Sequence, residues 1–299
     1  MKSKTSKMKN TNLRVLETPV KVETVATVVA AFEDFAPREL AEDWDRVGLQ
    51  VGDENMEVRK ILVALDTTEA VIKEAIKMGV DMIVTHHPLL FGKKPIDITT
   101  SSSVGRRVLM LAAAGIALYV MHTNLDIAYG GTSDVLADMI GLMSSRTPII
   151  PSGAIYNKAG ASGEVEIPLG LGRIGRLPEP MKFDEFVEHV KGKLHAPFVQ
   201  YSFSSSQKEV RKIAICTGSG ADAALIQAVA DASCDVYITG DVKYHMAQMA
   251  EEQGVALIDA THYFSEVIVV PVVGKYIKKV MPHLVVTLSQ VDGSMMYIR

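Results

Sequence analysis

Short apolar runs alternate with stretches of helical spacing along most of the chain. Apolar runs of strand length lie at 60–66, 81–87 and 116–121, and segments with helical spacing lie at 67–78, 101–114 and 132–142. Buried parallel strands have nearly continuous apolar sequences, and a helix between two of them carries the chain back to start the next. The pattern therefore predicts an α/β fold with largely parallel or mixed sheets covered by helices.

The second half of the chain repeats this order. KIAICTG at 212–218 resembles KILVALD at 60–66, DVYITGD at 235–241 resembles DMIVTHH at 81–87, and GVALIDATH at 254–262 resembles GIALYVMH at 115–122. All parallel strands share an apolar composition, which explains part of the likeness. The repeated Gly-Ile/Val-Ala-Leu followed by a histidine favours a duplicated α-β-(βα)3 unit.

The repeat divides the chain into four parts. We expect a disordered basic extension at 1–20, a first α/β repeat at 21–143, a loop-rich connector at 144–180 and a second α/β repeat at 181–299. The connector is rich in Gly and Pro, and short strands at 163–167 and 172–177 could give it a hairpin.

Composition narrows the class of protein. The 299 residues are 48% hydrophobic and carry 31 basic against 35 acidic side chains, so no global positive field exists to attract nucleic acid. No apolar stretch approaches the roughly 20 residues of a membrane span. Cys216 and Cys234 fit no metal or redox spacing and are expected to be buried thiols in a reducing compartment, the cytoplasm.

Four of the eight histidines lie with acidic residues at the ends of predicted strands: His86 and His87, His122 with Asp126, and His262 with Glu266. In α/β sheets ligands bind at the carboxyl ends of the strands, so these motifs should open on one edge. Each half places a carboxylate four residues after a histidine, and a helical turn would put both on one face. Imidazole and carboxylate together suit a divalent metal ion.

The two halves are not equivalent at this edge. Gly240 and Asp241 stand in the second half where His86 and His87 stand in the first, which favours one composite site. Two neighbouring imidazoles at a strand end could reach two metal ions about 3.5–4 Å apart.

Other residues near the strand ends have alternative roles. Asp45 and Asp241 could be acceptors that orient the ligating imidazoles, or helix caps and turn formers. Trp44 is expected in the core. The remaining histidines, which are expected to have structural roles, are His189, His195, His245 and His283.

The motifs resemble those of the GTP cyclohydrolase 1 type 2-like family, also called the Ngg-interacting factor three family. The matching segments are AEDWDRVGLQVGD (41–53), DMIVTHHPLLF (81–91), MHTNLDIAYGG (121–131), TGDVKYHM (239–246) and IDATHYFSE (258–266). The likeness covers nearly the whole chain after about residue 20. Two positions depart from the family, which usually has Asn at Arg46 and often Gly at Thr261.

The resemblance implies two intertwined α/β repeats in a homohexameric ring whose metal sites face an inner cavity. It implies two divalent metal ions per chain (Zn, Fe, Mn, Co or Ni). The implied ligands are His86, His87, Asp126, His262 and Glu266, with Glu266 as the bridge. His122 is outside this set and is a candidate third nitrogen ligand or orienting residue.

The leading functional hypothesis is a metal-dependent hydrolase that acts on a nucleotide or related phosphorylated small molecule through metal-activated water. The family name implies hydrolytic opening of the guanine ring of GTP. Candidates for a catalytic role are Glu266, His122 and Asp241. The Gly-rich turn at 217–225 could seat an anion at a helix N-terminus, but an ordinary strand-to-helix turn is the favoured interpretation.

Two alternatives remain open at this stage. One is a non-catalytic protein that binds or delivers metal, or serves as an interaction partner. The other is a nucleic-acid-associated regulator, which the net acidity disfavours.

Overall fold

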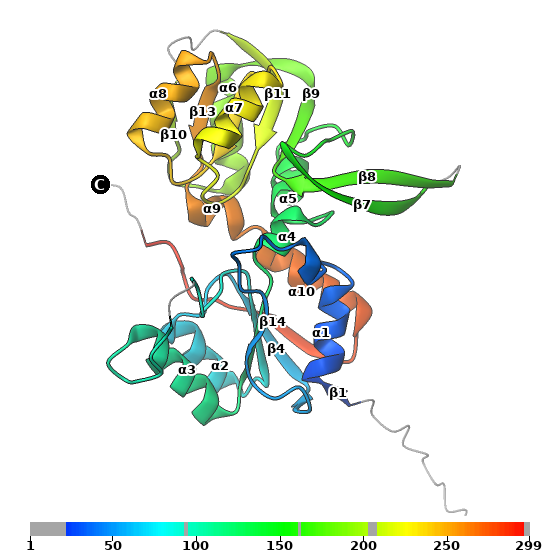
Figure 1. The fold of residues 1–299 in the computed structure, drawn as a ribbon, viewed down its shortest axis with the longest axis vertical. Helices are drawn as coiled ribbons and strands as arrows, with labels where there is room; N and C mark the ends of the chain where they lie inside the picture. Colours follow the sequence, from blue (N-terminus) through cyan, green and yellow to red (C-terminus); the bar gives the residue numbers. More distant parts are fainter. Residues whose placement is uncertain (1–21, 93–94, 161–162, 203–207, 296–299) are drawn as a thin grey trace, which may run out of the picture.

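The computed structural model describes residues 22–92, 95–160, 163–202 and 208–295. The predicted extension at 1–20 lies outside these residues. Two α/β halves lie one above the other, with short helices between them and a long hairpin projecting to one side (Figure 1). The chain is therefore an α/β protein, as its sequence pattern predicts.

The lower half in Figure 1 is built on a five-stranded sheet with the order β14-β4-β5-β6-β2. Strands β14, β4, β5 and β6 run parallel, and β2 runs antiparallel beside β6. The strands are β2 (Gly48–Val51), β4 (Lys60–Ala64), β5 (Met82–Thr85), β6 (Ala117–Val120) and β14 (Val285–Leu288). A two-residue pair, β1 (Glu23–Thr24) with β3 (Glu57–Val58), lies apart from this sheet.

Helices cover both faces of this sheet. Ile61 and Val63 of β4 pack with α1 and α10, whereas Leu62 and Ala64 pack with α2 and α3 on the opposite face. Both faces are buried, which is why the strand is a continuous apolar run rather than an alternating one. The helices are α1 (Val25–Glu33), α2 (Glu69–Met78), α3 (Ser103–Ala114) and α10 (Val269–Val280).

The upper half contains a second mixed sheet with the order β10-β13-β12-β11-β9. Strands β11, β12 and β13 are parallel, and β10 and β9 are antiparallel at the two edges. The strands are β9 (Arg173–Lys182), β10 (Gln200–Ser202), β11 (Glu209–Ile215), β12 (Val236–Thr239) and β13 (Ala256–Asp259). The helices packed on its faces are α5 (Thr132–Met139), α6 (Phe183–Leu194), α7 (Ala223–Asp231) and α8 (Tyr244–Glu252).

Four strands of each sheet follow the same order and directions. The sequence β2-β6-β5-β4 in the first sheet corresponds to β10-β13-β12-β11 in the second, and only the fifth strand differs. The halves also exchange elements, because α10 and β14 pack with the first sheet and α5 packs with the second. An internal duplication would produce this arrangement, and the duplication itself stays an interpretation, as do the predicted domain limits.

The segment predicted as a loop-rich connector is mostly extended. Strands β7 (Ile150–Gly160) and β8 (Gly163–Leu171) form the projecting hairpin, and β9 joins the second sheet. The predicted short strands lie inside β8 and β9, but they do not form a hairpin with each other, because β8 pairs with β7 and β9 pairs with β11. The glycines of this segment were taken as a sign of loops, but one of them lies at a tight turn between two strands. Gly172 has φ +66° there, a left-handed backbone conformation that favours glycine.

The expectations about the cysteines and about membrane spans can be compared with the described residues. Cys216 and Cys234 are both buried, as expected. Within the described ranges no helix has the length and apolar character needed to cross a membrane. The cytoplasmic location stays a prediction.

Candidate metal centre

The carboxyl ends of the central parallel strands of the two sheets meet between the halves of the molecule. His86 and His87 follow β5 directly, at the end of a strand whose four residues are all buried. The Nδ1 of His86 donates to the carbonyl oxygen of Met121, 2.8 Å away at the end of the neighbouring strand β6. This bond fixes the tautomer, so the Nε2 of His86 carries a lone pair.

The predicted helical turns after β6 and β13 are present. His122 precedes α4 (Thr123–Ile127), which carries Asp126, and α9 (His262–Glu266) begins and ends with the other predicted pair. In α9 the Nε2 of His262 lies 3.0 Å from Glu266 Oε2, so the helical turn does place both on one face.

Glu266 lies at the centre of the cluster and is 3% exposed. Its Oε2 lies 2.8 Å from the Nε2 of His87 and 3.0 Å from that of His262, while its Oε1 lies 3.6 Å from the Nε2 of His86. Asp126 Oδ1 lies 3.7 Å from the same His86 nitrogen and accepts a hydrogen bond from Thr132. One carboxylate thus faces two different sets of side chains with its two oxygens.

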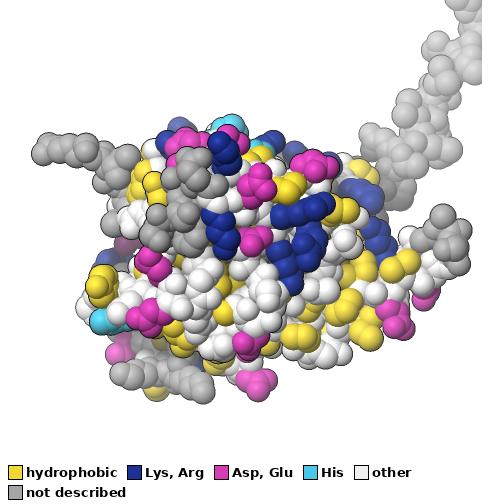
Figure 2. Space-filling model, turned by 90° about the horizontal axis from the view of Figure 1, so that it is seen from above, with side chains coloured by type: hydrophobic (Ala, Val, Ile, Leu, Met, Phe, Trp, Pro, Cys, Tyr) yellow, Lys and Arg dark blue, Asp and Glu magenta, His cyan; other side chains and the backbone are white. Residues whose placement is uncertain are grey.

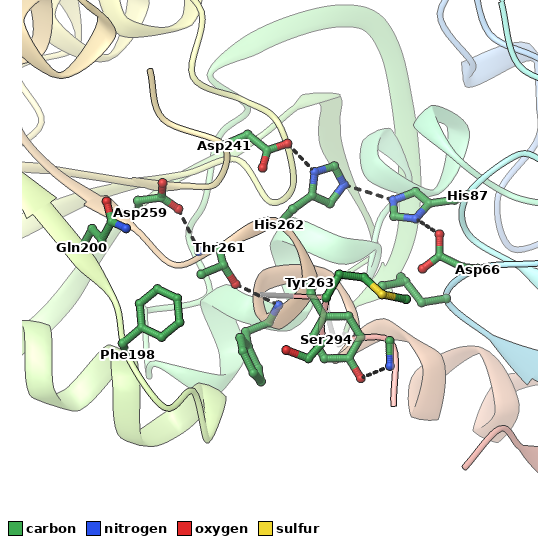
Figure 3. Close-up of a pocket in the computed structure, with 14 residues that line it drawn as sticks. Asp66, His87, Phe198, Gln200, Asp241, Asp259, Thr261, His262, Tyr263 and Ser294 are labelled. Carbon is green, nitrogen blue, oxygen red and sulfur yellow. Dashed lines mark hydrogen bonds and ion pairs between the residues drawn. The ribbon is translucent and has the colours of Figure 1, made fainter. Parts of the chain in front are cut away.

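Carboxylates support the histidines from behind. Asp241, His262, His87 and Asp66 follow one another in a row (Figure 3). The Nδ1 of His87 donates to Asp66 at 2.8 Å and that of His262 donates to Asp241 at 2.7 Å, which directs both Nε2 atoms toward Glu266. Such carboxylate–histidine pairs orient metal ligands in many metalloproteins. The interpretation of Asp241 as an orienting acceptor agrees with this geometry, whereas Asp66 was missed although it also follows a strand.

His122 is held in the same way. Its Nδ1 donates to Asp45 at 2.9 Å, and Asp45 also accepts from the backbone N–H and the hydroxyl of Thr123 at the start of α4. Asp45 therefore acts as an orienting acceptor, one of the two roles that the sequence left open. It is not the cap residue of α4, a position that His122 occupies, although it accepts from the first backbone N–H of that helix. Burial opposes the charge of Asp45, but the bonds from His122 and Thr123 hold its pKa well below its ordinary value.

The electrostatics of the cluster favour bound positive charge. Burial disfavours the imidazolium form of His87, but Asp66 and Glu266 outweigh it and raise the pKa of His87 to about 10. Burial is likewise outweighed at His262 by Glu266 and Asp241, which raise its pKa to about 9. Burial also opposes the charge of Glu266, yet the surrounding histidines hold its pKa well below the usual range. The negative charge of these carboxylates stabilises either a proton or a metal ion bound to the histidines.

Among the described residues, three overlapping groups of side chains could hold a metal ion. They are His86 with Asp126 and Glu266, His87 with His262 and Glu266, and His86 with His87 and His122. The donor chemistry fits a divalent transition metal. A second observation supports the fit: the buried Nε2 of His86 has no hydrogen-bond partner, which is costly unless a cation coordinates it.

Two glycines make room for the cluster, and sequence reasoning missed both. A Cβ on Gly218, whose φ is +66°, would lie 1.9 Å from Glu266 Oε1. A Cβ on Gly240 would lie 2.7 Å from the backbone nitrogen of His262. Thr261 has φ 61° and ψ 155°, a conformation that glycine adopts far more easily, and its hydroxyl accepts from Phe264 at the start of α9.

Two of the cavities in the described part of the chain have His262 in their walls. The smaller, of about 310 Å³, lies beside Asp66, His87, Asp241 and His262 (Figure 3). The larger, of about 580 Å³, is lined by residues that include Trp44, His122, Asp126, His262 and Glu266. Trp44 is 43% exposed, so its expected place in the core was wrong.

The other predicted elements do not join the cluster. His189 lies within hydrogen-bond distance of the carbonyl of Ile140 and His283 pairs with Glu23, in keeping with structural roles. The turn at 217–225 is a strand-to-helix turn, and the carboxylate of Asp222 accepts from the backbone of Ala224 and Leu225 at the start of α7. That helix N-terminus is thus occupied by the chain's own anion.

An α/β protein with two mixed sheets and a His/carboxylate cluster between them is the class that the fold and site define. A sequence model of the Duf34/NIF3 (NGG1p interacting factor 3) family matches residues 23–293, and the chain belongs to this family.

Curated relatives and solved structures agree with this family assignment. The "GTP cyclohydrolase 1 type 2 homolog" of Clostridium perfringens is 38% identical over 239 residues, covering 80% of this chain and 85% of the relative. That of Methanocaldococcus jannaschii is 38% identical over 245 residues, covering 80% and 88%. A Bacillus cereus protein related to NIF3 superposes with a TM-score of 0.83 at 25% identity, covering 93% and 100%. Reduced HcgD from M. jannaschii gives 0.74 at 32% identity, covering 91% and 100%.

The close approach of Gly218 to Glu266 generates a prediction. Gly218→Ala should abolish most zinc binding, because the new methyl group displaces the Glu266 carboxylate. Gly79→Ala is the matched control: Gly79 has φ +61°, and a Cβ there meets nothing within 4 Å. Both variants bear backbone strain of about 1–3 kcal/mol, measurable by urea unfolding. Zinc content after dialysis separates them, and full zinc binding by Gly218→Ala would refute the proposed crowding.

Proposed function

We propose that this protein is a metal-dependent hydrolase whose site holds two divalent ions per chain. The observation that carries the proposal is the position of Glu266, whose two oxygens face two separate groups of potential ligands. His86 and Asp126 would complete one site, and His87 and His262 the other, with Glu266 as the bridge. Zn, Fe, Mn, Co and Ni all suit such mixed ligands.

The residues around the cluster hold the candidate metal ligands in fixed orientations, as a catalytic metal centre requires. Bound divalent ions supply Lewis acidity and make water a nucleophile near neutral pH. Asp66 and Asp241 direct the Nε2 atoms of their histidines into the cluster, where a metal ion would replace the proton, and the Met121 carbonyl directs that of His86. The two cavities that border the cluster favour a substrate-accessible centre over a closed structural one.

The three catalytic candidates have different surroundings. Glu266 is enclosed by histidines, and Asp241 stands behind His262, so both are engaged in building the centre. His122 lines the larger cavity with its Nδ1 held by Asp45. Its other ring nitrogen is available for a metal ion as a further ligand, or for a proton of the substrate.

The names of the curated relatives make GTP the first nucleotide to test. The phosphorylated substrate expected from the sequence has less support, since the described residues that line the two cavities include no Lys or Arg. A non-catalytic metal-binding or interaction role is the alternative, and the family description of an interacting factor favours keeping it.

Metal content and hydrolysis test this proposal together. Wild-type protein should bind about two equivalents of zinc or manganese per chain by elemental mass spectrometry and hydrolyse GTP or another nucleotide. Glu266→Ala should lose most of the metal and the activity while unfolding at a similar temperature, because the bridge is gone. His245→Ala, at an exposed histidine outside the cluster, is the control. Two tightly bound ions without hydrolysis of any nucleotide or related compound would instead support the non-catalytic role.

We further propose that the chain forms a homo-oligomer, a hexamer by resemblance to its family. The projecting hairpin supports self-association, because Ile155, Tyr156 and Val165 are 55%, 41% and 51% exposed on it. Figure 2 shows hydrophobic side chains gathered toward the side from which the hairpin projects. Exposed apolar side chains on an extended hairpin are typical of a surface that another chain covers.

Ile155→Asp should therefore shift the mass measured by light scattering from a multiple of the 32.5 kDa chain to a smaller species. A charge placed in a covered apolar contact is strongly unfavourable. Ile76→Asp makes the same change at a similarly exposed position, 47%, on α2 and should leave the mass unchanged. A monomeric wild-type chain, or an unchanged mass for Ile155→Asp, would contradict the proposal.

A further inference from the structure

Two large aromatic side chains are exposed at the wall of the larger cavity. Trp44 is 43% exposed and Phe91 is 55% exposed, and both line the cavity that contains Asp126 and Glu266 of the cluster. Burying aromatic surface is strongly favourable, so a ring that covers these faces would gain binding free energy.

The aromatic rings form a corner. Trp44 and Phe91 have centroids 5.9 Å apart and planes at 84°, and His122 stands nearly perpendicular to both at 6.1 and 6.2 Å. A flat ring stacked on one of these faces can meet the edge of a neighbour, the two arrangements that aromatic pairs prefer.

Hydrogen bonds fix the backbone near both aromatic residues. The Gln50 side chain accepts from the backbone of Leu90, next to Phe91, and donates to the carbonyl of Arg46, close to Trp44. The backbone N–H of Glu42 donates to Thr123, which ties the Trp44 loop to α4. Preorganised contacts of this kind lower the entropic cost of binding.

The charges of the cavity wall away from the metal centre disfavour phosphate. The charged lining residues outside the cluster, in the described part of the chain, are the carboxylates Glu42 and Asp222, whereas Asp126, His262 and Glu266 belong to the cluster itself. Asp222 also fills the N-terminus of α7, the backbone position that would otherwise attract an anion. A polyphosphate that extended away from the metal centre would meet the like charge of Glu42 and Asp222, whereas N–H groups on a neutral ring would find acceptors there.

We propose that the larger cavity binds a flat, neutral, N–H-bearing heteroaromatic ring without phosphate, stacked in the Trp44–Phe91 corner beside the metal centre. This inference rests on the proposed function, because it names the substrate class of the same site. It departs from the phosphorylated substrate expected from the sequence.

Trp44 is the only tryptophan of the chain, so intrinsic fluorescence reports on this cavity directly. Guanosine, GTP and inorganic tripolyphosphate would each be titrated into the full-length, metal-loaded protein. Guanosine should quench Trp44 saturably, GTP should bind no tighter than guanosine, and tripolyphosphate should neither quench nor compete. Tighter binding of GTP by tenfold or more, competition by tripolyphosphate, or no quenching by guanosine would overturn the inference.

Variants locate the binding. Phe91→Ala should weaken guanosine binding about tenfold, in the range measured for the loss of one aromatic stacking partner, and leave metal content unchanged. Phe91→Tyr should restore binding. Tyr244→Ala, at a 78% exposed aromatic outside the cavity, is the control and should have no effect. Equal guanosine affinity for Phe91→Ala and wild type would overturn the assignment.

The same experiments separate this inference from the proposed hydrolase. Saturable guanosine quenching without hydrolysis of any compound supports the ring site while the hydrolase proposal fails. Metal-dependent hydrolysis of substrates that do not perturb Trp44 fluorescence overturns the ring site while the hydrolase proposal stands.

Discussion

The organisation of this molecule depends on one buried carboxylate. Glu266 is 3% exposed at the junction of the two sheets, where an unpaired negative charge would be very unfavourable. Three imidazoles surround it, two of them backed by Asp66 and Asp241. Each half of the fold supplies part of this arrangement, so neither sheet alone can build the centre.

The difference between the halves explains why a repeated pattern forms one centre. His86 and His87 follow β5 in the first half, whereas Gly240 and Asp241 follow β12 in the second. A side chain at Gly240 would collide with the start of α9, and Asp241 instead accepts from His262. At these two positions the second half therefore provides no metal ligand. Gly240 leaves room for the start of α9, and Asp241 orients His262.

The sequence located the residues that converge, because each follows a parallel strand and such strand ends share an edge. It also predicted the helical turns after β6 and β13, the second of which places Glu266 beside His262, and the mixed α/β sheets. Asp126 lies beside His86 instead of His122. These inferences rest on local periodicity and on the connection rules of parallel strands, which need no knowledge of distant contacts.

What the sequence could not supply depends on contacts between distant segments. The role of Gly218 follows from its approach to Glu266, and that of Trp44 from the bonds that hold Asp45 against α4. The long hairpin was obscured by glycines, because turns and strand interiors with special backbone angles look alike in a single sequence. Exposure of an aromatic residue likewise follows from packing and not from its own type.

Anomalous X-ray diffraction from crystals grown with zinc or manganese tests the central claim most directly. The account predicts two peaks about 3.5–4 Å apart, one beside His86 and Asp126 and one beside His87 and His262, with a different oxygen of Glu266 bound to each. A single peak, or two peaks that do not share Glu266, would contradict it.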